Sequence, residues 1–399
     1  MAYDLKKIHD DFPALASGLA FFDGPGGSQV PIQVAQAISE AMIRPISNRN
    51  VITLSERNAD EIVIKFRQAV ADLLNANPTG VIYGRSWTQM TYDFSRTLAK
   101  TWTVGDEIIV TNLDHDSNIR PWVQAAEAAG VTIRWAKFDL ATGELPTSSI
   151  SELLNDKTRL VAVTGAANTL GTRPDIRAIA HEVHKFDALL YVDGVHLTPH
   201  TPIDIQELGA DFYGISFYKL FGPHCSALAV KPEILKTLEN DKLLPSTSLF
   251  PERFELGTLP YELMAGCTAS IDYISNLVEG TGHRRQRIVH SMSQAEEYES
   301  ELFGYMESEI EALPGITLYG HAQKRTPTLY FNIKGVEGAD VYQHLAGLKI
   351  NAPAHNFYAL EASRALGLGD TGAVRAGLAP YSTTDDVDRL VAGLRQLTK

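Results

Sequence analysis

The segment SFYKLFGPHC, residues 216–225, places a single lysine, Lys219, between an apolar run and a Gly-Pro turn at Gly222 and Pro223. An amine held beside apolar side chains loses hydration, so its neutral form becomes easier to populate. A neutral amine is a nucleophile that condenses with aldehydes. We therefore interpret Lys219 as a candidate for covalent catalysis rather than as a surface lysine.

Further polar residues stand at the ends of other apolar runs. His115 follows residues 107–114, Asn168 ends 159–168, and Asp193 lies in LLYVDGVH (189–196), which ends at His196. Each of these residues alone is more often structural than functional. In an open α/β sheet, however, ligands collect where the strands end, so these side chains can meet at one site.

The turn GRSWTQM, residues 84–90, leads into a predicted helix and carries Ser86, Trp87 and Thr88. The N–H groups at a helix N-terminus bind phosphate readily. Small hydroxyl side chains beside those N–H groups favour the same ligand. This turn is therefore a candidate phosphate site.

Together these residues meet the needs of pyridoxal phosphate (PLP). That cofactor requires a lysine for its Schiff base, here Lys219, and a carboxylate at its pyridine nitrogen, here Asp193. The carboxylate keeps the nitrogen protonated, which makes the ring an electron sink. The 84–88 turn can hold the phosphate, His115 can lie flat against the ring, and Asn168 can hydrogen-bond the phenolic oxygen.

The elements that must position these residues alternate between strands and helices. A helix is predicted over 57–77, where Ile62, Phe66, Val70 and Leu73 share one face. Apolar runs then predict strands at 107–114, 131–139, 159–168, 189–196, 212–219 and 226–231. Several of them lack strict alternation, as strands do when helices cover both faces of a sheet. The pattern indicates an α/β fold with a mostly parallel sheet, whose 226–231 strand turns back as a hairpin.

The C-terminal third of the chain has a different pattern. Residues 238–252 are predicted as a long loop, and 286–313 as a helix that ends at Pro314-Gly315. Strands at 328–335 and 373–379, a helix near 338–346, and a last helix capped by Ser382 or Thr383 follow. We predict an N-terminal arm (1–20), a large PLP-binding α/β domain (21–275) and a small α+β domain (276–399).

The composition is that of a globular protein with an acidic balance. Of 399 residues, 35 are Lys or Arg and 48 are Asp or Glu, which gives a net charge of −13. This charge disfavours nucleic acid and anionic membranes as partners. Two cysteines allow no disulfide framework or zinc site, and no metal site is predicted. The sequence shows no apolar run long enough for a signal peptide or a membrane span, so we expect a cytoplasmic protein.

The sequence resembles the class V aminotransferase family, in the cysteine-desulfurase-like branch of fold-type I PLP-dependent enzymes. The matching segments extend over almost the whole chain, and the most specific part is the block from Asp193 to Lys219. They are FFDGPGGSQVP (21–31), GDEIIVTNLDHDSNIRPW (105–122), TGAANTLGT (164–172), YVDGVHLTPHTPIDIQELGADFYGISFYKLFGPH (191–224), RFELGT (253–258) and VRAGLAPYSTTDDVDRLVAGL (374–394).

The resemblance implies a role for each candidate residue. Lys219 would carry the cofactor and move the substrate Cα proton, Asp193 would pair with the pyridinium, and His115 would stack on the ring. Asn168 would lie near the phenolic oxygen and the substrate carboxylate. The phosphate would be held by Thr88, Ser216 and the 86–87 turn. Thr258 would reach the phosphate of the neighbouring subunit in a homodimer, and Arg375 would bind the substrate carboxylate.

Three features depart from the family pattern. His196 stands where many relatives have Gln, and it can still hydrogen-bond the phenolic oxygen. Tyr218 precedes the lysine, where desulfurases have His. The loop that carries a persulfide-forming cysteine in desulfurases corresponds to INAPAHNFYALEASRALG (350–367), which contains no cysteine. For Cys225 and Cys267 we expect packing roles.

These departures favour a reaction that needs only PLP, the lysine and a carboxylate-binding arginine. Our leading hypothesis is β-elimination, with C–S bond cleavage, on a small cysteine-like amino acid or S-conjugate. Transamination and epimerisation are the alternatives. Asn356, with Phe357 and Tyr358, is predicted on a substrate-side loop, although a plain surface turn explains this segment equally well.

Two hypotheses from other classes explain the sequence less well. A non-catalytic protein with a PLP-enzyme fold has no need to keep Lys219, Asp193 and Arg375 together. A nicotinamide dehydrogenase would need a GxGxxG turn after a buried strand. The glycine-rich segment GPGG (24–27) has neither that spacing nor that setting.

Overall fold

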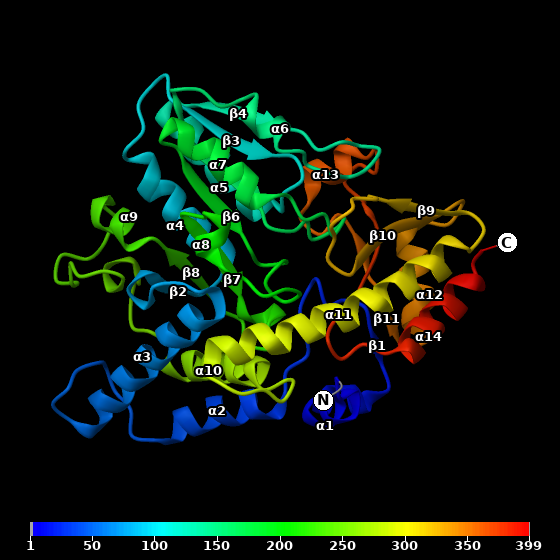
Figure 1. Ribbon diagram of the computed structural model, residues 1–399, viewed down its shortest axis with the longest axis horizontal. Helices are drawn as coiled ribbons and strands as arrows, with labels where there is room; N and C mark the ends of the chain where they lie inside the picture. Colours follow the sequence, from blue (N-terminus) through cyan, green and yellow to red (C-terminus); the bar gives the residue numbers. More distant parts are fainter. Residues whose placement is uncertain (1–2, 399) are drawn as a thin grey trace.

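The computed structural model describes residues 3–398, and its larger unit is built around a seven-stranded sheet, on the left in Figure 1. Its strand order is β2-β8-β7-β6-β5-β3-β4. The neighbours from β7 to β4 pair in parallel, whereas β8 is antiparallel to both β7 and β2. The strands are β2 (Val81–Gly84), β3 (Glu107–Thr111), β4 (Thr132–Ala136), β5 (Thr158–Thr164), β6 (Leu189–Asp193), β7 (Phe212–Ser216) and β8 (Ser226–Val230). The predicted α/β fold, mostly parallel sheet and hairpin strand are confirmed.

Helices cover both faces of this sheet, which explains why its strands lack alternation. In β6, Leu190 and Val192 join one hydrophobic core while Tyr191, between them, joins another. Successive strand residues point to opposite faces, so both faces are buried. The first core includes residues of α3 (Leu54–Leu74), α7 (Ile176–Val183), α8 (Ile205–Leu208) and α10 (Tyr261–Ser275); the second includes residues of α4 (Trp87–Ala99), α5 (Arg120–Ala129) and α9 (Pro232–Thr237).

A second, smaller unit surrounds a four-stranded antiparallel sheet of order β12-β13-β10-β9. Its strands are β9 (Ile316–Tyr319), β10 (Thr328–Ile333), β12 (Ala354–His355) and β13 (Ala373–Gly377), and its helices are α12 (Gly338–Gly347), α13 (Leu360–Ala365) and α14 (Thr384–Arg395). The short strand β1 (Ala20–Phe21) pairs in parallel with β11 (Ile350–Asn351), and Phe22 packs in the core of this unit. The predicted domain boundaries stay a prediction.

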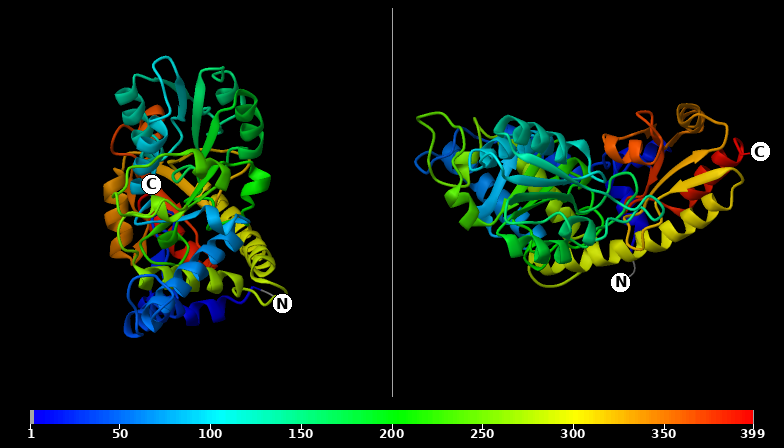
Figure 2. Two further views of the ribbon diagram at one scale, coloured as in Figure 1. Left: turned by 90° about the vertical axis from the view of Figure 1, so that its left-hand side faces the viewer. Right: turned by 90° about the horizontal axis from the view of Figure 1, so that it is seen from above.

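The helix α11 (Arg284–Glu311) connects the two units, and Figure 2 (right) shows it running along one side of the molecule. Its first half places Ile288 and Met292 in a core of the large sheet. Its second half places Leu302 and Met306 in the core of the small unit. One continuous helix therefore sets the position of Arg375, on β13, relative to the strand ends of the large sheet.

The predicted helices are present with boundaries shifted by a few residues. The helix expected at 57–77 is α3, which begins after a capping box between Thr53 and Glu56 and ends at Asn75 in the left-handed conformation. The last helix, α14, is capped by Thr383, one of the two residues named. The remaining helices are α1 (Leu5–Asp11), α2 (Ile32–Ile43) and α6 (Ser148–Ser151). Within residues 3–398, no helix is long and apolar enough to cross a membrane.

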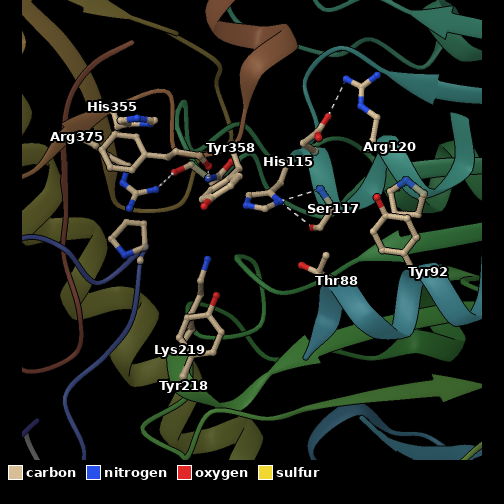
Figure 3. Close-up of a pocket in the computed structure, with 16 residues that line it drawn as sticks. Thr88, Tyr92, His115, Ser117, Arg120, Tyr218, Lys219, His355, Tyr358 and Arg375 are labelled. Atoms are coloured by element: carbon tan, nitrogen blue, oxygen red, sulfur yellow. Dashed lines mark hydrogen bonds and ion pairs between the residues drawn. The ribbon is translucent and has the colours of Figure 1, made fainter. Parts of the chain in front are cut away.

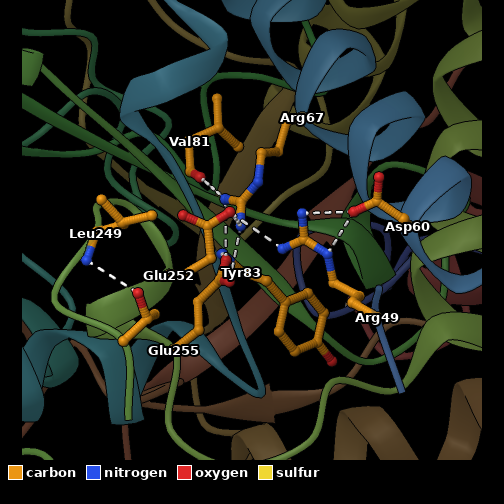
Figure 4. A network of polar contacts seen from close by, with 9 residues as sticks. Arg49, Asp60, Arg67, Val81, Tyr83, Leu249, Glu252 and Glu255 are labelled. Atoms are coloured by element: carbon orange, nitrogen blue, oxygen red, sulfur yellow. Dashed lines mark hydrogen bonds and ion pairs between the residues drawn. The ribbon is translucent and has the colours of Figure 1, made fainter. Parts of the chain in front are cut away.

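The segment predicted as a long loop, 238–252, has no helix or strand until the short turn Glu252–Phe254. A network of charged side chains holds its end against α3 and β2 (Figure 4). Arg67, on α3, donates to Glu255 at 2.8 Å, and Glu255 also accepts from the N–H of Tyr83 at 2.8 Å. Arg49 bridges Asp60 and Glu252 at 3.0 Å each. This network fixes the backbone that leads to Thr258.

Candidate active site

A cavity of about 770 Å³ opens at the carboxyl ends of the central strands, between the two units of the chain (Figure 3). A smaller cavity of about 80 Å³ adjoins it on the side of the sheet. Lys219, His115 and Asn168 line both cavities, and Arg375 lines the larger. The strand ends thus bring together residues that lie far apart in the sequence, as expected for an open α/β sheet.

Lys219 ends a one-turn 3-10 helix, Phe217–Lys219, that directly follows β7. The turn after it is tight because Phe221 has a φ of 63° and because a Cβ on Gly222 would lie 2.9 Å from that of Phe217. The lysine is only 7% exposed. Burial, and to a lesser extent the charge of Arg375, lower the pKa of Lys219 to about 7, although the charge of Asp193 opposes the fall. The amine is therefore substantially neutral at neutral pH, in the form that attacks an aldehyde.

Asp193 is the last residue of β6 and is 5% exposed. Its Oδ1 accepts the backbone N–H of Val195 at 3.0 Å, and its Oδ2 accepts the indole N–H of Trp87 at 2.7 Å. Burial raises the pKa of Asp193 to about 6, while these two donors and the Lys219 charge favour the ionised form. The carboxylate is thus fixed in orientation at the floor of the smaller cavity.

His115 lies on the loop after β3, in a position held by buried hydrogen bonds. Its Nδ1 accepts the backbone N–H of Ser117 at 3.1 Å, so the proton of the neutral ring is on Nε2. The preceding Asp114 is fully buried and accepts from Asn118 at 2.7 Å, which fixes the loop. Burial, together with the Lys219 and Arg375 charges, lowers the pKa of His115 to about 3. A neutral, flat ring therefore lines the cavity.

The predicted phosphate cradle is the N-terminus of α4. Ser86 caps the helix by accepting the N–H of Gln89 at 3.1 Å, and Thr88 lines both cavities. Ser216 lines the smaller cavity from β7, and its hydroxyl lies 3.0 Å from that of Ser226. Hydroxyl groups and free helix N–H groups suit an anionic group such as a phosphate.

Arg375, on β13, enters the larger cavity from the small unit and is 2% exposed. Its Nη1 donates to the backbone carbonyl of Asn168 at 3.0 Å. Its guanidinium lies over the Phe357 ring, with Cζ 3.7 Å from the ring centroid. Gly26 leaves room for this side chain, since a Cβ there would lie 3.1 Å from Nη2. Among the described residues the Nε has no hydrogen-bond partner. The guanidinium of Arg375 can therefore still bind a carboxylate.

Two further predicted residues lie at the cavity, and two lie apart from it. Asn168 and His196 both line the smaller cavity, where His196 Nε2 is 3.0 Å from Thr326 Oγ1. Asn356 turns away, donating to the carbonyl of Asp370 at 2.7 Å, whereas its neighbours Phe357 and Tyr358 line the larger cavity. Thr258 lies at a separate small hollow beside Arg85.

Sequence reasoning missed some residues of the larger cavity. Tyr92, on α4, and Arg120, on α5, line its outer part, and Arg120 pairs with Asp116 and Glu361. Tyr92 lies one helical turn after Thr88, and this spacing was a usable signal. The contact of the Trp87 indole with Asp193 was also missed.

The residues present fit PLP. Within the described part of the chain, Asn168 Oδ1 and His196 Nδ1 are buried without a hydrogen-bond partner, although buried polar atoms normally have one. Both residues line the cavity that contains Lys219 and Asp193. A polar ligand between them would supply the missing partners. A buried amine, an opposed carboxylate and a phosphate cradle in one cavity are the features that PLP requires.

This fold and this site define a fold-type I PLP-dependent enzyme. The chain belongs to the aminotransferase class V family, whose model matches residues 20–390. It is 35% identical over 400 residues to an uncharacterized protein of Mycobacterium tuberculosis (strain CDC 1551 / Oshkosh), MT3887, with 100% of each chain covered. It is 30% identical to a cysteine desulfurase of Enterobacter sp. (strain 638), over 100% of this chain and 99% of that protein.

Solved structures agree on the fold. The cysteine desulfurase CsdA from Escherichia coli, in an S-sulfonic acid form, superposes with a TM-score of 0.88 at 24% identity, covering 100% of both chains. The predicted resemblance to the cysteine-desulfurase-like branch of class V enzymes is confirmed by these matches. The chain is therefore a PLP-dependent enzyme.

Proposed function

We propose that this enzyme cleaves the C–S bond of a small cysteine-like amino acid by β-elimination, without a persulfide-forming cysteine. The observation that carries the proposal is the lining of the two cavities. Among the described residues, no cysteine lines either of them. A desulfurase needs an accessible thiolate to attack the substrate sulfur.

Both cysteines are buried in a hydrophobic core. The Sγ atoms of Cys225 and Cys267 lie 3.1 Å apart, so each thiol is packed against the other. Burial raises the pKa of Cys267 well above its ordinary value, which disfavours a thiolate. These features support packing roles and argue against sulfur transfer.

The residues of the site can carry out elimination. PLP, when bound, supplies an electron sink for the electron pair left at Cα. Arg375 binds the substrate carboxylate through its free N–H groups and thereby orients Cα toward Lys219. The amine of Lys219 takes the Cα proton. Departure of the thiolate then breaks the bond between Cβ and sulfur, and hydrolysis of the released enamine gives a keto acid and ammonia.

Tyr218 can assist the leaving group. It lines both cavities, and the ring centroid lies 5.8 Å from Lys219 Nζ. Figure 3 shows the two side chains pointing the same way into the cavity. Burial and the charge of Asp193 raise the pKa of Tyr218, so its hydroxyl stays protonated and can donate a hydrogen bond to the departing sulfur.

Product analysis tests this proposal. With an S-alkyl cysteine as substrate, we expect keto acid, ammonia and thiol in equal amounts. Formation of pyridoxamine phosphate with the keto acid would instead indicate transamination, and racemised substrate would indicate epimerisation. Alanine from cysteine would indicate desulfuration and would contradict the argument from the cavity lining.

We also propose that the enzyme is a homodimer in which Thr258 reaches the partner's phosphate site. Support comes from exposed apolar side chains on two neighbouring segments, α2 to α3 and 243–256: Met42, Ile43, Val51, Ile52, Leu54, Leu243, Leu244, Leu249 and Leu256. The bridge between Arg49 and Glu252 holds these segments side by side. Apolar side chains gathered in this way are typical of a protein interface. Sedimentation should give a dimer, and a fully active monomer would contradict the proposal.

A further inference from the structure

Trp87 has two parts that face different features of the site. Its backbone is the first residue of α4, at the predicted phosphate cradle. Its side chain extends toward the sheet, where the indole Nε1 donates to Asp193 Oδ2 at 2.7 Å. Both residues are 5% exposed, so water does not compete for this hydrogen bond.

The surrounding residues leave the indole a single position. A Cβ on Gly214 would lie 1.7 Å from an indole carbon, so the ring rests directly on the backbone of β7. On another side the indole stacks on Tyr191, with ring centroids 5.3 Å apart and an interplanar angle of 25°. A ring packed this closely cannot turn without moving its neighbours. The indole N–H is therefore a fixed donor.

The second oxygen of Asp193 is fixed as well. Oδ1 accepts the backbone N–H of Val195 at 3.0 Å, immediately after β6. Two rigid donors, one on each oxygen, define the plane of the carboxylate. Each oxygen can accept more than one hydrogen bond, so the group can still accept one from a ligand in the cavity.

We propose that Trp87 is a positioning residue, whose indole N–H orients the Asp193 carboxylate toward the pyridine nitrogen of PLP. This inference rests on the proposed cofactor site. Donors to a carboxylate favour its ionised form, and an ionised Asp193 keeps the pyridine nitrogen protonated. A single residue would thereby connect the phosphate cradle to the carboxylate at the other end of the cofactor, and Gly214 makes the room for it.

The test compares Trp87→Phe with Trp122→Phe, using PLP labelled with ¹⁵N at the pyridine nitrogen. The first substitution keeps an aromatic ring but removes the donor. The second is a matched control, because Trp122 is also buried and also donates from its indole, to Asn118 at 3.2 Å. Circular dichroism establishes that both variants fold.

In Trp87→Phe, we expect the ¹⁵N signal to move toward that of an unprotonated nitrogen. Its titration midpoint should fall to lower pH, and PLP should bind roughly tenfold more weakly or worse, since a hydrogen bond to a charged group is lost. Trp122→Phe should match the wild type. An unchanged ¹⁵N titration in Trp87→Phe, with PLP bound, would overturn the inference but leave the proposed function intact. Failure of the wild type to bind PLP at Lys219 would overturn both.

A double-variant experiment separates positioning from general packing. In an Asp193→Ala background, Trp87→Phe should cause no further loss of PLP affinity, because Trp87 acts through Asp193. Additive losses would show that the indole acts by packing alone and would overturn the proposal. Gly214→Ala provides a second route, since its methyl group must displace the indole, and we expect the same shift of the ¹⁵N titration.

Discussion

The lowered pKa of Lys219 can be measured in the apoprotein by brief acetylation with a trace of acetic anhydride. Only the neutral amine reacts, so the extent of labelling follows the neutral fraction at each pH. With a pKa of about 7, half of Lys219 is neutral at pH 7. An ordinary lysine, with a pKa of about 10.4, is neutral in roughly one molecule in 2,500 at that pH. Peptide mass spectrometry gives the labelling of each lysine separately.

We expect the labelling of Lys219 to level off above about pH 8, whereas the labelling of surface lysines in the same sample keeps rising tenfold per pH unit to about pH 10. Asp193→Asn provides the perturbation. The negative charge of Asp193 raises the pKa of Lys219, so its removal should move the midpoint of Lys219 to lower pH. A Lys219 profile that parallels the surface lysines, or a midpoint that rises in Asp193→Asn, would refute the electrostatic reasoning.

Three further predictions concern the roles of single side chains. Asp193→Ala should leave the fold and the covalent PLP linkage largely intact but slow exchange of the substrate Cα proton in D₂O by roughly a hundredfold or more; near wild-type exchange would count against the pyridine assignment. Arg375→Lys keeps the charge but loses the planar fork, so kcat/KM should fall roughly tenfold or more, mainly through KM; an unchanged KM would exclude a carboxylate contact. The double substitution Cys225→Ala and Cys267→Ala should preserve the rate of the chemical step, with a stability loss on the order of 1–2 kcal/mol per site in thermal unfolding; abolished turnover in a folded double variant would show that a thiol participates.

Much of the fold could be predicted from the sequence because its local signals agree. The long helix α11 keeps one apolar face, with Ile288, Met292 and Leu302 at helical spacing, and was predicted within two residues at each end. The helix α2 was not predicted, and α10 has only a weak signal in the sequence. In α10 the buried residues include Ser270 and Ser275 beside Ile271, so no clean polar face marks the helix. The partner that buries this mixed surface is set by the tertiary fold, which periodicity does not reveal.

The candidate site was predictable where it depends on strand ends and less so where it depends on loops. Asp193 and Lys219 end or follow parallel strands, and such ends meet at one edge of a sheet. Asn356, in contrast, lies on a loop whose next residues, Phe357 and Tyr358, adopt positive φ angles of 52° and 60°. This unusual backbone directs Phe357 onto Arg375 and Asn356 away from the cavity, and it has no signature in residue type.

The indole of Trp87 illustrates a second limit. A sequence pattern places this residue at a helix N-terminus, but the direction of its side chain depends on space elsewhere in the fold. That space exists because residue 214 is glycine, on a strand 127 positions further along the chain. Similarly, Cys225 and Cys267 were each expected to pack in the core, but nothing in the sequence indicated that they contact each other.

The most direct test of the central claim is the location of the cofactor linkage. The purified protein should be supplied with PLP, reduced with borohydride and digested, and the modified peptide identified by mass spectrometry. We expect a single phosphopyridoxyl adduct, on Lys219, that is lost in Lys219→Ala. No adduct, or an adduct on another lysine, would contradict the assignment of this site.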